Sequence, residues 1–281
     1  MKPCMNARNT ALTIALALTA VGAGARANPR PLPFTYQAET LPQGALEVEQ
    51  FVDLVPVRAH SFATGNPIWF LASQMQTEFE IGLTNKLELG LYLTLAPVAS
   101  PEYAYQVPTL LDGNGIKQRL RYRLADPEEW PVDVALYGEI VENEREIELE
   151  AKIILQRRVG RVRFITNLWA EREFYFDGQR EWVLNPTLGV TAELSPRYHL
   201  GAESWMRVEY LDGQTGPRAF NQGPHVYVGP AFMANFGKLW WTTGVYLRVT
   251  DFDRTVAVGD MTTAGDSFGH FWFRTIVGLS F

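Results

Sequence analysis

The chain is built from runs of roughly ten residues in which apolar and polar positions alternate, the pattern of barrel strands that cross a membrane. In the run that closes the chain, Phe271, Phe273, Val277, Leu279 and Phe281 lie on one face. The opposite face of the same run includes Arg274 and Ser280. Strands that are apolar on one side and polar on the other, repeated many times, predict an antiparallel, up-and-down transmembrane β-barrel.

Turn-forming residues divide the chain into twelve such runs. They span about 44–56, 67–83, 86–97, 114–125, 131–142, 146–158, 161–174, 181–194, 197–211, 224–236, 239–251 and 268–281. An even number of strands is what a bacterial single-chain barrel requires. We therefore expect an all-β barrel of about twelve strands.

The connections between these runs are of two kinds. The second, fourth, sixth, eighth and tenth are short, at 84–86, 126–130, 159–160, 195–197 and 237–238. The others are mostly longer, at 57–66, 98–113, 175–180, 212–223 and 252–267, with a short one only at 143–145. Short periplasmic turns and long outer loops are typical of outer-membrane barrels. The apolar side chains of 98–113 fit either a loop that covers the barrel mouth or a surface patch.

The alternative is a soluble lipocalin-like barrel or sandwich, in which the apolar face would point inward. Aromatic residues near the strand ends argue for the membrane barrel, because they would form two girdles at the membrane interfaces. The outer girdle would contain Trp69, Phe174, Trp182, Tyr210 and Phe271, and the inner one Phe79, Tyr198, Trp241 and Phe281.

The N-terminus has the pattern of a secretory signal peptide. Lys2 and Arg8 precede an apolar stretch of about 13 residues, which is shorter than the ~20 that a membrane-spanning helix needs. Ala25-Arg26-Ala27 is a small-residue cleavage site, so we expect cleavage after Ala27. The expected organisation is a signal peptide (1–27), a periplasmic N-terminal segment (28–43) and an outer-membrane barrel (44–281).

Charge narrows the possible partners. The formal net charge of −6 would become −9 after cleavage, because Lys2, Arg8 and Arg26 would be removed without any acidic residue. An acidic chain argues against binding of nucleic acid, which favours a basic surface.

The polar faces of the predicted strands are rich in charged side chains. A basic row (Lys117, Arg119, Arg121, Arg123) and an acidic one (Glu139, Glu148, Glu150) would face the lumen, together with Arg207, Arg248 and Arg274. These charges would form a salt-bridged lattice, a pore-lining field that selects ions, or both. The excess of acid favours a weak preference for cations, unless the basic row lies at the constriction.

Candidate chemistry for an enzyme is sparse. Outer-membrane lipases need a paired Ser and His near the outer rim; His60 adjoins Ser61, and Ser267 lies near His270, but no G-x-S-x-G motif occurs. The histidines lack metal-ligand spacing, and 112–115 (Asp-Gly-Asn-Gly) is better interpreted as a turn than as a calcium loop. We therefore expect that the protein is not an enzyme and that it binds neither a metal nor a cofactor.

Three stretches resemble a known group. Residues 43–49 (QGALEVE), 78–92 (EFEIGLTNKLELGLY) and 185–197 (NPTLGVTAELSPR) resemble the uncharacterised outer-membrane "transporter" barrels assigned to the meta-pathway of phenol degradation. The resemblance implies an outer-membrane protein, and a channel for small or aromatic solutes. The resemblance assigns no functional residues to this chain. The last strand also resembles the signal that the barrel-assembly machinery reads, carried by Phe271, Phe273, Leu279 and Phe281, which implies that machinery as a transient partner.

These observations together predict a passive, narrow channel for small solutes, embedded among outer-membrane lipids and lipopolysaccharide. Two alternatives remain open, a closed structural or adhesion barrel and an outer-leaflet lipid hydrolase.

Overall fold

The computed structural model describes residues 28–60, 67–95, 98–99, 115–143, 145–213, 224–250, 256–257 and 270–281. The expected signal peptide and most of the 98–113 loop lie outside these ranges. Across the described ranges, no helix has the length and apolar character needed to cross a membrane.

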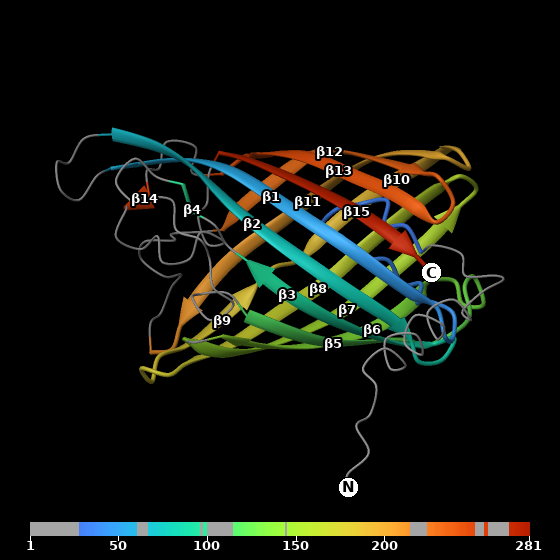
Figure 1. The fold of residues 1–281 in the computed structure, drawn as a ribbon, viewed down its shortest axis with the longest axis horizontal. Coiled ribbons are helices and arrows are strands. Elements are labelled where there is room, and N and C mark those ends of the chain that lie inside the picture. The colour runs from blue at the N-terminus through green and yellow to red at the C-terminus, as the bar shows by residue number, and fades with distance from the viewer. Residues whose placement is uncertain are drawn as a thin grey trace, which may run out of the picture.

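The strands form one closed antiparallel barrel (Figure 1). Its long strands are β1 (Leu46–His60), β2 (Pro67–Gly82), β3 (Leu87–Leu95), β5 (Gly115–Arg123), β6 (Asp133–Asn143), β7 (Glu146–Val159), β8 (Val162–Tyr175), β9 (Arg180–Leu184), β10 (Thr187–Ser195), β11 (Tyr198–Leu211), β12 (His225–Asn235), β13 (Leu239–Arg248) and β15 (Phe271–Ser280). Each pairs with its neighbour along the chain, and β1 closes the barrel by pairing with both β2 and β15. Two-residue strands β4 (Val98–Ala99) and β14 (Val256–Ala257) extend the edges of β2 and β1.

Strands β9 and β10 together form one barrel strand. Both pair with β8 and with β11, and they are separated only by Asn185 and Pro186. Proline has no backbone N–H and cannot donate to the ladder, so the strand is interrupted there. Asn185 N still donates to Trp169 O at 3.0 Å, and Pro186 O accepts from Met206 N at 3.1 Å. Counted this way, the barrel has the twelve strands that the alternation predicts.

The two-residue repeat places the apolar face on the outer wall. Leu120, Leu168 and Val245 are about half exposed there, whereas the inward-facing Arg119 and Glu88 are buried. Seven of the nine aromatic residues expected at the strand ends are exposed on the same wall: Phe79, Trp182, Tyr198, Tyr210, Trp241, Phe271 and Phe281. Phe174 is partly exposed, and the side chain of Trp69 lies outside the described part of the structure. The soluble-barrel alternative, with its apolar face inward, therefore does not describe this molecule.

The N-terminal segment (residues 28–43) lies inside the barrel. Leu32, Phe34, Tyr36, Ala38 and Leu41 are all buried, and Figure 1 shows this blue stretch enclosed by strands towards the end at which the C-terminus lies. The segment that was expected to be periplasmic thus enters the lumen at this end of the barrel. Leu32, Tyr36 and Ala38 of the segment form a buried cluster there with inward-facing apolar residues of the wall.

Candidate functional site

The lumen is occupied by the N-terminal segment, and inward-facing polar side chains of the wall bind its backbone. Glu203 on β11 accepts hydrogen bonds from Phe34 N at 3.1 Å and Thr35 N at 2.9 Å. Asn167 on β8 accepts from Tyr36 N at 2.8 Å and donates to Tyr36 O at 2.9 Å. A segment outside the β-ladder needs such partners because buried backbone groups are costly when unpaired.

Two further wall residues continue this pattern toward the barrel end. Gln156 on β7 accepts from Ala38 N at 3.2 Å, and Glu88 on β3 accepts from Leu41 N at 2.7 Å. The segment is therefore bound along its length by strands from both sides of the barrel.

Aromatic and cationic contacts fix its side chains. The Phe34 ring stacks on Trp205 with centroids 4.7 Å apart, and the guanidinium carbon of Arg274 lies 3.8 Å from the Phe34 centroid. The Tyr36 ring contacts two cations, Arg30 at 3.8 Å and Lys152 at 4.3 Å. Desolvated cation–π contacts of this kind contribute on the order of 2 kcal/mol each.

The lumenal arginines of β5 bind glutamates of β2 and β3. Arg119 contacts Glu78 through Nε at 2.7 Å, Glu88 through a terminal nitrogen at 2.7 Å, and Glu80. Arg121 also bonds Glu88, at 2.7 Å. All of these side chains are buried.

Most of the basic row thus pairs with acids other than Glu139, Glu148 and Glu150. Arg119 and Arg121 are each only 1% exposed, and Arg123 reaches Asp126 in the short turn at 3.1 Å. Only Lys117, at the other end of the row, pairs with one of the three acids, Glu139, at 3.4 Å.

On the long-loop side of the N-terminal segment the lumen holds a cavity of about 200 Å³, here called the vestibule. Phe34 and Tyr36 line it from the segment. Its acidic residues outnumber its basic ones: Glu139, Glu146, Glu148, Glu150, Glu171 and Glu173 against Lys117, Lys152, Arg207 and Arg274. The formal charge of the lining is consequently negative.

Most of the vestibule charges are paired. Lys152 contacts Glu150, and Arg207 reaches Glu171 at 3.3 Å and Glu173 at 3.4 Å. Glu148 is half-buried and, among the described residues, has no ion-pair partner. Glu146 also lines the vestibule and forms no ion pair in the described part of the chain, so both carboxylates could meet a solute cation.

The two remaining sequence-predicted arginines also lie in the lumen. Arg274 on β15 binds Asp53 on β1 through two hydrogen bonds, of 2.7 and 2.6 Å. Arg248 is buried on β13. Phe271, Phe273 and Leu279 of the assembly signal are on β15, and Phe281 directly follows it. Phe271, Leu279 and Phe281 are exposed on the outer wall. The role proposed for each of these residues stays a prediction.

Sequence reasoning missed Glu203 and Asn167, which anchor the N-terminal segment. One signal was present: Leu32, Phe34, Tyr36 and Ala38 alternate with other residues as in a strand. The paired Ser and His residues considered for an enzyme cannot be placed, since Ser61 and Ser267 lie outside the described residues.

Comparison with known proteins bears on the fold. No protein-family profile and no curated protein sequence matches the chain. Among solved structures, the COG4313 outer membrane channel from Pseudomonas putida F1 matches with a TM-score of 0.57 and 12% identity, over 87% of this chain and 98% of that one. The fold is that of an outer-membrane β-barrel. The NanC porin matches with a TM-score of 0.53 and 12% identity, over 83% of this chain and 98% of that one. At these identities the likeness concerns the architecture alone.

Proposed function

We propose that the protein is a passive outer-membrane channel for small solutes, with a preference for cations. The observation that carries the proposal is the vestibule, a polar cavity inside a closed barrel whose lining carries more acidic than basic side chains. Charged rings of this kind set the selectivity of other pores. The N-terminal segment is the constriction that a solute has to pass.

Two further observations support this function. The solved barrels of similar architecture named above are a channel and a porin by name. The resemblance to the meta-pathway transporter barrels adds aromatic solutes as candidates, and the vestibule offers aromatic surfaces at Tyr137 and Trp169.

The second candidate is a closed structural barrel, and the buried N-terminal segment favours it. A liposome-swelling assay with the refolded chain distinguishes the two functions. A channel admits small sugars and amino acids at rates that fall with solute size. A closed barrel leaves the swelling rate at that of empty liposomes, and this result would end the channel proposal.

Replacing Glu148 by Gln is expected to weaken the preference for cations. The substitution removes a vestibule carboxylate that has no ion-pair partner among the described residues, while keeping its size. The reversal potential in a KCl gradient should move toward the value for a non-selective pore.

The matched control is Glu142→Gln. Glu142 lies on β6, at the same end of the barrel, but it is exposed on the outer wall. Equal shifts in both variants would show that the surface charge, and not the vestibule, sets selectivity.

The same proposal includes export and location. The chain would be cleaved after Ala27, inserted by the barrel-assembly machinery through the outward aromatic face of β15, and surrounded by outer-membrane lipid and lipopolysaccharide. N-terminal sequencing of the protein from isolated outer membranes tests both the location and the cleavage site.

A further inference from the structure

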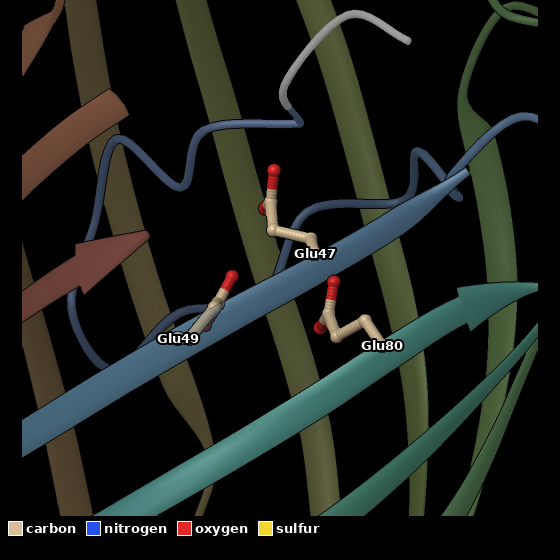
Figure 2. Close-up of side chains that lie close together, drawn as sticks. All are labelled: Glu47, Glu49 and Glu80. Carbon is tan, nitrogen blue, oxygen red and sulfur yellow. The ribbon is translucent and has the colours of Figure 1, made fainter. Parts of the chain in front are cut away.

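Three carboxylates converge in the lumen close to the start of the described chain. Glu47 and Glu49 project from β1 and Glu80 from β2, on the same side of the two strands (Figure 2). They are at most 1% exposed, and ligand oxygens from the three lie within 4.8 Å of one another. Glu47 and Glu80 are directly opposite across the strand pair. Like charges in that position repel, so the trio needs a cation.

Side-chain cations reach only part of this region. Five buried carboxylates (Glu47, Glu49, Glu78, Glu80, Glu88) face three buried guanidinium groups (Arg30, Arg119, Arg121). Arg30 pairs with Glu49 at 3.4 Å, and Arg119 with Glu80. Among the described residues, Glu47 pairs with no cationic side chain. In addition, Glu47 Oε1 and Glu49 Oε1 are buried and accept no hydrogen bond.

A main-chain N–H group already donates to Glu47, the carboxylate that lacks a cationic partner. The backbone nitrogen of Asn28 lies 3.3 Å from Glu47 Oε2 and donates to it. The neighbouring segment holds Asn28 in place, since Gln37 Nε2 donates to Asn28 Oδ1 at 2.6 Å and Asn28 Nδ2 donates to Glu39 O at 3.3 Å. Asn28 is also the residue that directly follows the expected cleavage site, Ala25-Arg26-Ala27.

We propose that the trio of Glu47, Glu49 and Glu80 is the binding site for the α-ammonium group that cleavage after Ala27 creates on Asn28. Hydrolysis of the Ala27–Asn28 peptide bond converts a neutral amide with one N–H into a primary amine, which is protonated at neutral pH and then has three N–H donors. One donor retains the bond to Glu47 Oε2, and two further donors become available for the unpartnered Glu47 Oε1 and Glu49 Oε1. The new charge supplies the cation that Glu47 lacks.

A divalent cation fits the trio less well. Calcium takes six to eight oxygen ligands. Three of the trio's oxygens are engaged by donors, because Glu47 Oε2 accepts from Ser280 and Asn28, Glu49 Oε2 from Arg30, and Glu80 Oε1 from Arg119. An ammonium group needs only the acceptors that remain.

The consequence is that removal of the leader and docking of the N-terminal segment are coupled. A chain that retains residues before Asn28 has an amide at this position and leaves Glu47 without a cation. This inference rests on the cleavage site and is independent of whether the barrel conducts.

The test compares two refolded chains, one that begins at Asn28 and one with a single Gly added before it. Hydrogen–deuterium exchange of residues 28–40 is the readout. Because a charge-assisted hydrogen bond is stronger than a neutral one, exchange should be about tenfold slower in the chain that begins at Asn28. Glu47→Gln should abolish the difference between the two chains, and Glu39→Gln, a nearby carboxylate that pairs with Arg163, should leave it intact.

Three results would overturn the proposal. One is equal exchange in the two unmutated chains, which needs no variant to fold. Another is a mature protein, identified by mass spectrometry, that begins at a residue other than Asn28. The third is stoichiometric calcium in the protein after dialysis against Ca²⁺, with exchange slowed by Ca²⁺ to the same extent in both chains.

Discussion

Deletion of residues 28–40 should raise the single-channel conductance of the barrel at least several-fold. In this stretch, the side chains of Leu32, Phe34, Tyr36 and Ala38 are buried in the lumen. The strand pairing that closes the barrel does not involve them, because it begins at β1. Removing them leaves an intact barrel with a wider bore. Recordings of the refolded proteins in planar bilayers measure the effect.

The variant Glu203→Gln serves as the intermediate case. It keeps every side chain of the segment but replaces the charged acceptor of Phe34 N and Thr35 N by a neutral one. More frequent brief openings are expected, without the large permanent increase. If the deletion variant folds and conducts no more than the whole chain, the segment is not the constriction.

Replacing Arg119 by Ala should destabilise the barrel by roughly 3–5 kcal/mol, the range for breaking a buried ion pair. Arg119 is the shared partner of Glu78, Glu80 and Glu88, all of which are at most 1% exposed. Without it these carboxylates repel one another in a region closed to water. Urea unfolding in lipid vesicles, followed by tryptophan fluorescence, measures the loss.

The matched control is Arg158→Ala. Arg158 pairs with Glu193 at 3.2 Å, but both side chains are about a third exposed or more. Exposed pairs contribute only about 0–1 kcal/mol. Combining Arg119→Met with Glu78→Gln and Glu80→Gln should restore part of the lost stability, since the buried charges leave together. A loss for Arg119→Ala as small as that for Arg158→Ala would contradict this account of the lumen.

The strands could be predicted from sequence because membrane and lumen impose opposite chemistry on alternate residues. Leu87, Leu91 and Leu93 show the outward repeat clearly, and Gly160 and Gly237 mark turns where the backbone has a positive φ. The break in the eighth strand was not predicted, because the alternation continues through Pro186. The alternation of apolar and polar side chains gives no information about whether a residue has a backbone N–H donor.

The N-terminal segment could not be placed from sequence for a different reason. Pro29, Pro31 and Pro33 lack the N–H groups of a ladder strand, so the alternation of Leu32, Phe34 and Tyr36 is not followed by sheet formation. The segment needs acceptors on distant strands instead. Glu203 and Asn167 supply them, but in sequence they resemble any other lumenal polar residue.

The lumenal charges were assigned to the correct face but not to their partners. The alternation of side chains along β5 places Arg119 inside the barrel. Which acids it contacts depends on the position of each residue along the barrel axis and on the stagger between strands. Arg119 therefore binds Glu78 and Glu80, two strands away along the wall, and forms no ion pair with Glu139, the residue opposite it on β6. This stagger comes from closure of the whole barrel, which no local pattern contains.

The most direct test of the central claim is the reversal potential of the refolded mature chain in a planar bilayer with a KCl gradient. The account predicts discrete conductance steps with a reversal potential displaced toward the potassium equilibrium potential, because the vestibule carries an excess of carboxylates. Protein that is folded, as shown by heat-modifiable migration, but that produces no steps would contradict a channel. Steps with a preference for chloride would contradict the assignment of selectivity to the vestibule.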